Sequence, residues 1–509
     1  MKLNRILSSI ISLSMILSLT ACGNTKAINN QTPNTSNIGD TTMETPEEPD
    51  NKEPDNKDTE ITPTEVSESF LNFVKSYKEY PKMLEMPDMG DTKYLGSDGS
   101  FDWESYSKDS DAYYDCLYSI RPDSSSNSYP ETLQKFTRES ALKFANTDNN
   151  SANEAYSPVN IYMALAMLAE VTDNNSQKQI LEVLGVESLE QLRADATLIW
   201  ESNYIDNGKS TLDFANSLWI NNTIEDSLNQ ETLDNVANNY YASTFSGTAG
   251  DPSYNQAIQD WLNYHTNNLL KEQAGGVEFS PDLVIALAST IYLKDSWTDE
   301  FSEEATYENT FYISNDKEIK TEFMRQSDIT TYYYGDNFGA ISKSMNSVGN
   351  MLLILPDDGK TPSDVLNSDD FWDFVNSRYN YCNTKTLRVN LEIPKFDISS
   401  KLDIVGGLKE LGITDVFNGA TSDFTPLTGE IDNIAVTSAT HAARVKIDEE
   451  GCEAAAFTVM MTKATSAIDL PQEEIDFILN RPFIFVITGE DDLPLFIGTV
   501  NTPVEGLDL

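Results

Sequence analysis

The sequence predicts an α+β fold with large sheets, and three observations support this class. Helical patterns dominate from about residue 129 to 185, strand and helix patterns alternate from about 211 to 412, and strand patterns close the chain. Helices followed by mixed elements and then by strands are typical of α+β proteins. The chain has 509 residues, of which 39% are hydrophobic, so it is long enough for one large domain or two to three ordinary ones.

The domain begins with three predicted helices. "TLQKFTRESALKFA" places Leu133, Phe136 and Phe144 near one face, as in an amphipathic helix. "VNIYMALAMLAEV" is apolar all round and therefore predicts a buried helix. "SQKQILEVLG" predicts a helix that ends at Gly185, because glycine favours the position just after a helix.

Strand patterns follow, with one short helix among them. "TLDFANSLWIN", "LVIALASTIYLKDSW" and "MLLILPDD" predict buried strands, and "TKTLRVNLEIPKFDIS" alternates between polar and apolar residues. "LDIVGGLKELGI" predicts a short helix. "RVKID" then alternates with Val445 and Ile447 on one face, and "PFIFVIT" and "PLFIGTVNTP" predict two closing strands.

The charge of the chain excludes one class of partner. The formal net charge is −48, and nucleic-acid binding requires a basic surface. The acidic residues are interpreted as a solvated surface, and many of them lie in the first hundred residues.

The N-terminus has the pattern of an export signal. Lys2 and Arg5 precede an apolar run from residue 6 to 19, which is too short for an ordinary membrane-spanning helix. "LTAC", ending at Cys22, resembles the lipobox of bacterial lipoproteins, in which the chain is cut before the cysteine and the cysteine receives lipid. This resemblance implies a protein anchored through Cys22 to the bacterial cell envelope and facing outside the cytoplasm, with no other membrane contact. The alternative is plain secretion with an incidental cysteine.

Two further segments separate this signal (1–22) from the main domain (129–509). Residues 23–65 are rich in Asn, Thr, Pro and acids, and predict a disordered acidic tether. Residues 66–128 are interpreted as an N-terminal extension with one or two helices that pack on the main domain, the first marked by helical spacing of Phe70, Phe73 and Val74.

No motif indicates an enzyme, a metal site or a cofactor. The two histidines are His265, expected on the polar surface of a helix, and His441, expected to be a structural histidine where a strand begins. The patterns GxSxG, HExxH and GxxxxGKS are absent. Apart from Cys22, the cysteines lie far apart with no CxxC pair, which indicates neither a zinc site nor a disulfide framework.

One segment conflicts with its neighbours. "DEEGCEAAAFT", residues 448–458, has helix-forming alanines between two strand patterns. An exposed flexible loop is the simple interpretation, but such local conflicts also mark functional or strained sites.

From about residue 130 to 505 the sequence resembles the serpins. The resemblance rests on "YSPVNIYMALAMLAEV", "FANSLWIN", "IYLKDSWTDEF", "EIPKFDIS", "LKELGITDVF", "EEGCEAAAFT", "RPFIFVIT" and "PLFIGTVNTP", in this order. It implies a large mixed sheet with further sheets, about eight or nine helices, and an exposed reactive loop near the C-terminus. It also implies a monomeric inhibitor of proteases that is not itself an enzyme.

The resemblance gives the alanine tract a role. In serpins a protease cuts the loop, and the N-terminal part of the loop then inserts into the main sheet as a new strand. A strand alternates faces, so Cys452, Ala454, Ala456 and Thr458 would share one face, and their small size suits a packed core. Gly451 would supply the flexibility of the hinge. The full hinge comprises Glu449, Glu450, Gly451, Cys452, Glu453, Ala454, Ala455, Ala456 and Thr458. These small residues favour an inhibitory member of the family.

The family register also implies the bond that is cut. Counting from Gly451, the bond is Thr465–Ser466, and a small residue there suggests a serine protease of elastase or subtilisin type, or alternatively a cysteine protease. Lys463 is the rival, which would attract a trypsin-like protease, and Met461 is a further alternative.

The resemblance also implies a buried polar network where the main sheet opens. The family usually has Ser at the position of Asn160 and Asn at the position of Ser289, beside a histidine that matches His441. We expect Ser157, Asn160, Ser289 and His441 to form one hydrogen-bonded network, because buried polar groups need partners. Trp297 matches a family tryptophan near the top of the sheet, and Asp295 stands where the family has glycine, without an evident role in the sequence. Because fold does not fix function, a non-inhibitory surface lipoprotein that binds a ligand, or is only a protease substrate, remains the alternative.

Overall fold

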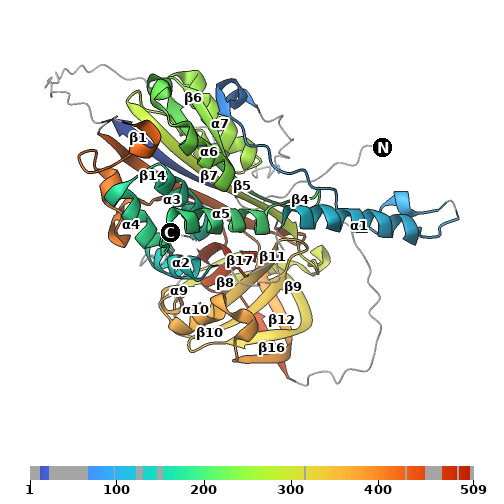
Figure 1. Cartoon of the computed structure of the whole chain (residues 1–509). Coiled ribbons are helices and arrows are strands. Elements are labelled where there is room, and N and C mark those ends of the chain that lie inside the picture. The colour runs from blue at the N-terminus through green and yellow to red at the C-terminus, as the bar shows by residue number, and fades with distance from the viewer. Residues whose placement is uncertain are drawn as a thin grey trace, which may run out of the picture.

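The computed structural model describes residues 67–96, 98–121, 130–145, 153–314, 317–429, 431, 433–452, 473–489 and 492–504, together with the backbone of residues 12–21. Two large sheets and the helices around them form the fold, and Figure 1 shows one sheet in the upper part of the molecule and the other below. The predicted α+β class is confirmed.

The first sheet is mixed and carries most of the features that matter for function. Its strands lie in the order β13 (Phe396–Asp403), β14 (Ile434–Ile447), β1 (Ser12–Ala21), β7 (Leu283–Ser296), β5 (Thr211–Asn221), β6 (Ala242–Gly247) and β2 (Val74–Ser76). Two short strands lie off this path: β15 (Gly451–Cys452) pairs with β7, and β4 (Ile205–Asp206) pairs with β5.

The second sheet contains the closing strands of the chain. Its order is β16 (Glu474–Ile478), β12 (Thr384–Pro394), β9 (Lys317–Tyr334), β10 (Phe338–Ser344), β11 (Gly349–Pro356), β17 (Phe483–Gly489), β18 (Pro494–Val500) and β3 (Glu154–Tyr156), with β8 (Tyr307–Ser314) paired to β9. Both β17 and β18 are fully buried, as expected for continuous apolar runs at the centre of a core.

Helices cover the first sheet and flank the second (Figure 1). They are α2 (Glu131–Phe144), α3 (Pro158–Glu170), α4 (Asn174–Leu184), α5 (Leu189–Asn203), α6 (Gln230–Asn239), α7 (Pro252–His265), α8 (Lys271–Ala274), α9 (Pro362–Leu366), α10 (Asp369–Asn376), α11 (Val405–Leu411) and α12 (Thr425–Thr428). Short 3-10 helices occur at Asn222–Ser227, Glu303–Ala305, Arg378–Asn380 and Asp415–Phe417. Every residue of α3 is buried, as its apolar sequence predicts, and Gly185 follows α4 with φ 73° in the left-handed region.

The N-terminal extension packs on the first sheet through β2 and Phe70, whereas α1 (Trp103–Ile120) has a single buried residue, Tyr113, and projects from the body of the molecule (Figure 1). The extension consists of η1 (Ser69–Phe73), β2, η2 (Thr92–Tyr94) and α1. The helix expected from the spacing of Phe70, Phe73 and Val74 is only one short 3-10 helix, because Val74 begins a strand that pairs with β6. The free edge of β6 supplies backbone hydrogen bonds there, so tertiary pairing overrides the local preference for a helix.

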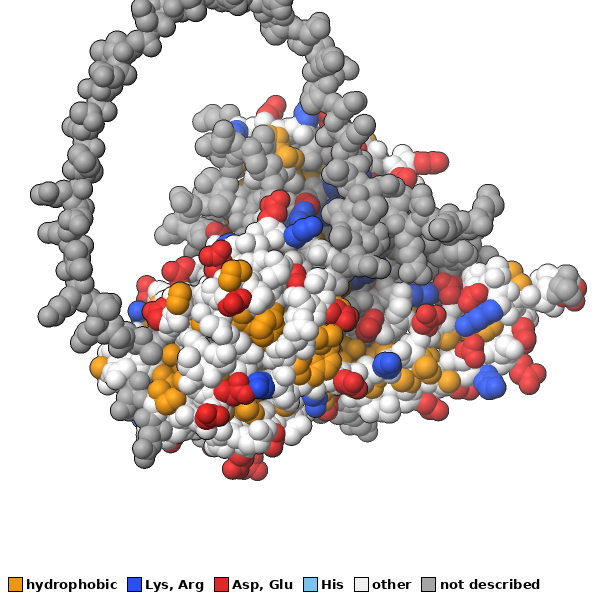
Figure 2. Space-filling model, turned by 90° about the horizontal axis from the view of Figure 1, so that it is seen from above, with side chains coloured by type: hydrophobic (Ala, Val, Ile, Leu, Met, Phe, Trp, Pro, Cys, Tyr) orange, Lys and Arg blue, Asp and Glu red, His pale blue; other side chains and the backbone are white. Residues whose placement is uncertain are grey.

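The surface is acidic, in agreement with the composition. Figure 2 shows acidic side chains spread over the face in view, with Lys and Arg scattered singly among the described residues there. None of the helices in the described part of the chain has both the length and the apolar character needed to cross a membrane.

We predict that Phe70→Ala loosens the extension from the domain. Phe70 is only 1% exposed and its ring lies edge-on to that of Phe245, with 6.0 Å between the centroids. The lost packing is expected to cost about 3 kcal/mol, measured as hydrogen exchange of β2 and by thermal unfolding. Leu71→Ala is the control, since Leu71 is 43% exposed and should change little; equal protection of β2 in Phe70→Ala and in the parent would contradict the packing role.

Candidate functional site

The predicted hinge lies at the C-terminal end of β7. After β14 ends at Ile447, the chain reverses, with Asp448 N–H donating to the Gly451 carbonyl at 3.2 Å. Gly451 and Cys452 then pair as β15 with Ser296 and Asp295. Trp297 reinforces the contact, because its backbone N–H donates to the Glu450 carbonyl and its indole Nε1–H donates to the Asp448 carbonyl, both at 3.0 Å. The hinge therefore begins as a strand on β7.

The structure gives a further reason for a glycine at position 451, besides the flexibility expected of the hinge. Its φ is 154°, and a Cβ at this position would lie 2.5 Å from the carbonyl oxygen of Asp295 and from the Cα of Ser296. Any side chain would collide with the backbone of β7. The glycine thus permits a close approach of two backbones, in addition to any flexibility it gives.

Glu449 ties the base of the hinge to the body of the protein. Its carboxylate accepts from Lys395 Nζ at 2.8 Å and from Thr306 Oγ1 at 2.7 Å, and its backbone carbonyl accepts from Phe301 N–H at 3.0 Å. Burial by itself would raise the pKa of Glu449, but the hydrogen bonds from Lys395 and Thr306 lower it overall. Glu449 is thus held as a carboxylate.

A strand position lies beside the hinge, between β7 and β14. The backbone of Ser12–Ala21 occupies it as β1 and pairs antiparallel with both neighbours. Met15 stands opposite Ser289 of β7 on one side and His441 of β14 on the other. Because β15 is also antiparallel to β7, β1 and β15 run in the same direction along β7. The main sheet therefore has room for a strand at its centre.

The structure brings together the four residues of the expected polar network. His441 Nε2 accepts from the backbone N–H of Ser157 at 3.1 Å, Ser157 Oγ accepts from the backbone N–H of Asn160 at 3.2 Å, and Asn160 Nδ2 donates to Ser289 Oγ at 2.8 Å. All four are buried. The network joins the first turn of α3 to β7 and to β14, the two strands on either side of β1. Trp297 lies apart from it, at the hinge.

Two atoms of this network lack a partner among the described residues, namely Asn160 Oδ1 and His441 Nδ1. Burial lowers the pKa of His441 to about 3, so the ring is neutral. Since Nε2 accepts a hydrogen bond, Nδ1 carries the ring proton. Among the described residues, the network therefore has one acceptor, Asn160 Oδ1, and one donor, His441 Nδ1, without a hydrogen-bond partner.

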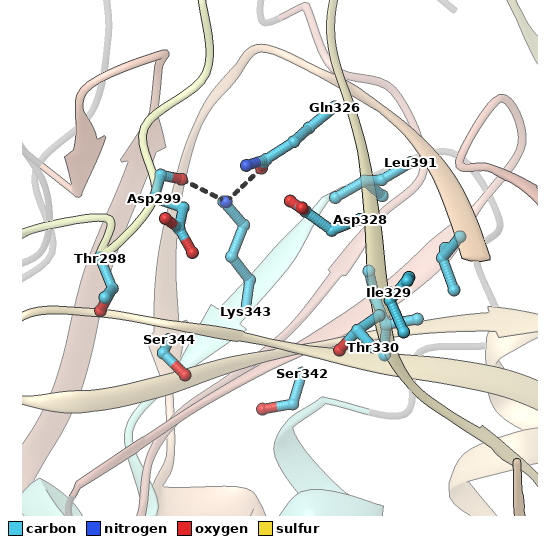
Figure 3. A pocket seen from close by; sticks show the side chains of 12 residues that line it. Thr298, Asp299, Gln326, Asp328, Ile329, Thr330, Ser342, Lys343, Ser344 and Leu391 are labelled. Carbon is cyan, nitrogen blue, oxygen red and sulfur yellow. Dashed lines mark hydrogen bonds between the residues drawn. The ribbon is translucent and has the colours of Figure 1, made fainter. Parts of the chain in front are cut away.

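A pocket of about 230 Å³ lies close to the hinge (Figure 3). In it, Lys343 Nζ donates to the Asp299 carbonyl and to Gln326 Oε1, both at 2.6 Å. The same ammonium group lies 5.5 Å from the ring centroid of Trp297 and 4.4 Å from that of Phe301. Burial lowers the pKa of Lys343 to about 8. Lys343 therefore supports the tryptophan that holds the hinge.

One expectation was wrong. His265 is buried rather than on the surface: its Nδ1 lies 3.1 Å from Asp213 Oδ2, and its ring packs against Trp261 at 4.7 Å between centroids. The C-terminal end of α7 lies over the first sheet, which a helical pattern alone does not reveal.

The remaining predicted site residues lie outside the described residues. These are Cys22, the reactive-bond candidates Thr465, Ser466 and Lys463, and the distal hinge residues Glu453, Ala454, Ala455, Ala456 and Thr458. Sequence reasoning also missed two residues at the hinge. Lys395 was recognisable only as part of the "EIPKFDIS" motif, and Asp295 only as an acid where the family has glycine.

Comparisons with known proteins identify the family to which this fold belongs. The family model described as Serpin (serine protease inhibitor) matches residues 131–503. The chain belongs to the serpin family. Members of this family are typically inhibitors of serine proteases rather than enzymes.

Individual relatives span most of their own length in the match. Alpha-1-antitrypsin of Meriones unguiculatus is 28% identical over 369 residues, which cover 70% of this chain and 86% of the relative. The thermophilic serpin tengpin in its native state has a TM-score of 0.62 and 25% identity, covering 76% of this chain and 98% of its own. Thyroxine-binding globulin in complex with thyroxine shares the fold, with a TM-score of 0.59 and 21% identity over 74% of this chain and 99% of its own.

We predict that Asn160→Ser destabilises the protein by about 1–2 kcal/mol, because the shorter side chain leaves Ser289 Oγ without its donor in a buried site. Thermal unfolding measures the change. Asn222→Ser is the matched control, since Asn222 Nδ2 makes its hydrogen bond to Thr248 Oγ1 at the exposed surface. Unchanged stability in Asn160→Ser would show that the network does not hold α3 to β7.

We predict that Lys395→Met weakens the base of the hinge by about 1 kcal/mol, because it leaves the Glu449 carboxylate buried without its cation. The pKa of Glu449 is lowered in the folded protein, so the pair's stabilisation is present above the ordinary pKa of 4.5 and is lost as the pH falls below it. Chemical denaturation at pH 7 and pH 4 checks both points.

Glu322 supplies the control for this pair. It contacts Lys395 at 3.2 Å, but its side chain is 66% exposed, so Glu322→Gln should have almost no effect. If both variants lost the same stability, the effect could not be assigned to the buried Glu449 carboxylate.

Proposed function

We propose that this serpin is an inhibitor of a serine-type endopeptidase that acts once, as a suicide substrate. The single observation that carries the proposal is the continuity between the hinge and the central strand position. Gly451 and Cys452 already pair with the end of β7, and the position between β7 and β14 continues from there. A loop cut by a protease could therefore enter the sheet from its paired end, by adding one residue after another to β7.

The register makes this path specific. Gly451 pairs with Ser296, and Cys452 pairs with Asp295. A chain that continued in the same register would place Ala455 opposite Tyr292 and Thr458 opposite Ser289. These are the positions that Ser12 and Met15 occupy in β1.

The occupant of the strand position in the structure, β1, belongs to the predicted export signal. Signal removal before Cys22 would take residues 12–21 away and leave the position open in the mature chain. The backbone pairing of β1 supports the capacity of the sheet for a strand there, in a direction antiparallel to both neighbours. We infer that the cut loop takes this position in the mature protein.

The side chains of the loop suit the site. Cys452 is fully buried, and the alternating residues Ala454, Ala456 and Thr458 fall on the same face of an extended strand. In this register Thr458 would lie beside the polar network, in which Asn160 Oδ1 and His441 Nδ1 have no hydrogen-bond partner among the described residues. A hydroxyl group both donates and accepts, so it can pair with either. Insertion would thus bury small side chains and satisfy the network.

The target follows from the predicted bond. Thr465–Ser466 favours a protease of elastase or subtilisin type, and Lys463 favours a trypsin-like one. The relatives named alpha-1-antitrypsin carry trypsin in their name. With a lipid on Cys22 and residues 23–65 as tether, the inhibitor would act as a monomer outside the cytoplasm, at the bacterial cell envelope.

The alternative is a serpin-fold protein that binds a ligand or is merely cut. Thyroxine-binding globulin shows that a protein of this fold can be known by its ligand. The same experiment distinguishes the two functions.

We predict that the mature chain forms a covalent complex with elastase or subtilisin that survives denaturation in SDS. Gel electrophoresis measures the complex, and the melting temperature of the cut chain should rise by tens of degrees because the inserted strand adds a full set of backbone pairs. Ala454→Glu is the test variant: a charged residue on the buried face should block insertion and convert the inhibitor into a substrate. Glu453→Ala, on the opposite face, is the matched control.

Clipped chains with no covalent complex, from the unmodified protein, would identify a substrate-type serpin. Absence of both cutting and complex with these proteases and with trypsin would favour the ligand-binding alternative.

A further inference from the structure

An acidic side chain lies buried directly beneath the hinge. Asp295 is 0% exposed and stands opposite Cys452 in the pairing of β15 with β7. Its Oδ1 accepts from Ser210 Oγ at 2.8 Å and from the backbone N–H of Ser296 at 3.0 Å. Its Oδ2 accepts from the backbone N–H groups of Ser347 and Val348 at 2.8 and 2.7 Å. Four donors thus fix one carboxylate.

These bonds hold the part of β7 on which the hinge rests. Ser347 and Val348 belong to the turn between β10 and β11, and the neighbouring Asn346 donates from its backbone N–H to the Ser296 carbonyl at 2.9 Å. The backbone N–H of Thr298 donates to the Ser344 carbonyl at 3.0 Å. Asp295 therefore clamps this turn against the same residues that pair with Gly451 and Cys452.

A second contact of Asp295 leads away from the hinge. Ser210 lies in the turn between β4 and β5, directly before β5, and its backbone N–H donates to Asn207 Oδ1 at 2.8 Å. Asn207 in turn donates from Nδ2 to the hydroxyl oxygen of Tyr113 at 3.0 Å. Tyr113 lies on α1, in the N-terminal extension. All four side chains, Tyr113, Asn207, Ser210 and Asp295, are at most 3% exposed.

The extension grips the same turn by other contacts. The backbone N–H of Met86 donates to the Asn207 carbonyl at 3.0 Å, and Asp88 pairs with Lys209. A Cβ on Gly208 would lie 3.2 Å from Glu85 Cγ, so the extension packs closely over the turn. The family model matches from residue 131 onward, so α1 and residues 80–90 lie outside the matched part of the chain.

We propose that the N-terminal extension is a built-in brace for the hinge, and that it acts through the buried hydrogen-bonded series Tyr113, Asn207, Ser210 and Asp295. The extension fixes the turn at Asn207, the turn presents the Ser210 hydroxyl to Asp295, and Asp295 fixes the strand end that carries the hinge. Asp295 is a positioning residue in this series. The brace keeps the uncut loop docked at its first two residues.

The raised pKa of Asp295 makes the docking of the hinge depend on pH. The Cys452 thiol faces Asp295 from β15, with the Asp448 carboxylate near that thiol, whereas Ser210 and the β10–β11 turn present neutral donors. Burial raises the pKa of Asp295 to about 6, against the lowering effect of its hydrogen bonds from Ser347, Ser210, Val348 and Ser296.

The sign of the pH effect follows. A carboxyl group whose pKa is raised in the docked state stabilises that state fully below the ordinary pKa of 3.8 and loses this contribution as the pH rises through about 6. Acid should therefore favour the docked hinge, and neutral pH should loosen it.

The experiment measures hinge opening in the uncut mature protein, with no protease present. Cys452 is fully buried while docked, so its alkylation reports the fraction of time that the hinge is open. Peptide mass mapping gives the alkylation rate of Cys452 relative to that of exposed Cys382 in the same molecule, which cancels the pH dependence of thiol chemistry.

Tyr113→Phe tests the far end of the brace. It removes the oxygen that accepts from Asn207 and should raise the relative rate at Cys452 about three- to tenfold, while the separate buried cluster around Trp261 keeps its hydrogen-exchange protection. Tyr118→Phe on the same helix is the matched control, because Tyr118 is 69% exposed and should leave the rate unchanged.

Ser210→Ala and Asp295→Asn test the near end by pH profile. In the parent, the relative rate should rise roughly tenfold between pH 4.5 and 7.5, with a midpoint near pH 6. Ser210→Ala should move that midpoint upward, because the Ser210 hydroxyl bond lowers the pKa of Asp295. Asp295→Asn should remove the pH dependence over this range.

The brace is overturned if Tyr113→Phe labels at the parent's rate, or if Tyr118→Phe raises the rate equally. A profile that is the same in Asp295→Asn as in the parent overturns the role of Asp295. A global loss of structure is recognised because Phe279, Trp261 and their neighbours form a separate buried cluster, whose hydrogen exchange would then rise together with the labelling. In that event the milder Tyr113→Phe decides alone. The brace is tested on the uncut protein without any protease, so these labelling results do not depend on whether the protein inhibits proteases.

Discussion

The structure depends on one backbone contact, the pairing of Gly451 and Cys452 with the end of β7. This contact directs the chain after β14 back along the main sheet instead of away from it. It requires a glycine, because the backbones of the hinge and of β7 approach too closely for any Cβ. In the proposed insertion, the loop would enter the strand position between β7 and β14 at the end where the hinge is already paired.

Charged groups surround this contact in an unusual arrangement. Glu449 is held by Lys395, and Lys343 supports Trp297 from the pocket beneath, whereas Asp295 is buried with neutral donors and no cation within its hydrogen-bonded set. Burial shifts the pKa of Lys343 down and that of Asp295 up, in both cases toward the neutral form. The side chains next to the hinge therefore lose solvation free energy when they are charged. Small changes in their surroundings are expected to change how firmly the hinge stays docked.

The extension connects this region to a part of the chain that the family model does not include. Phe70 and β2 attach it to β6, while Met86 and Tyr113 attach it to the turn at Asn207. The extension is therefore attached to the first sheet at two separate places, the edge strand β6 and the turn between β4 and β5. This gives a physical meaning to residues that composition alone describes only as acidic and aromatic.

The sequence by itself determined the elements whose patterns are strong, and its resemblance to the serpins indicated which residues meet at the network. The apolar run of α3 and the strand patterns of β7 and β11 could be read directly, because periodicity follows from burial. The tertiary structure decided what depends on distant neighbours. Val74 became a strand because β6 offered a free edge, His265 was buried because α7 packs over the sheet, and Asp295 acquired four donors from three separate segments. Hydrogen bonds between residues far apart in sequence leave no local pattern, so only the folded chain could show that the extension reaches the hinge.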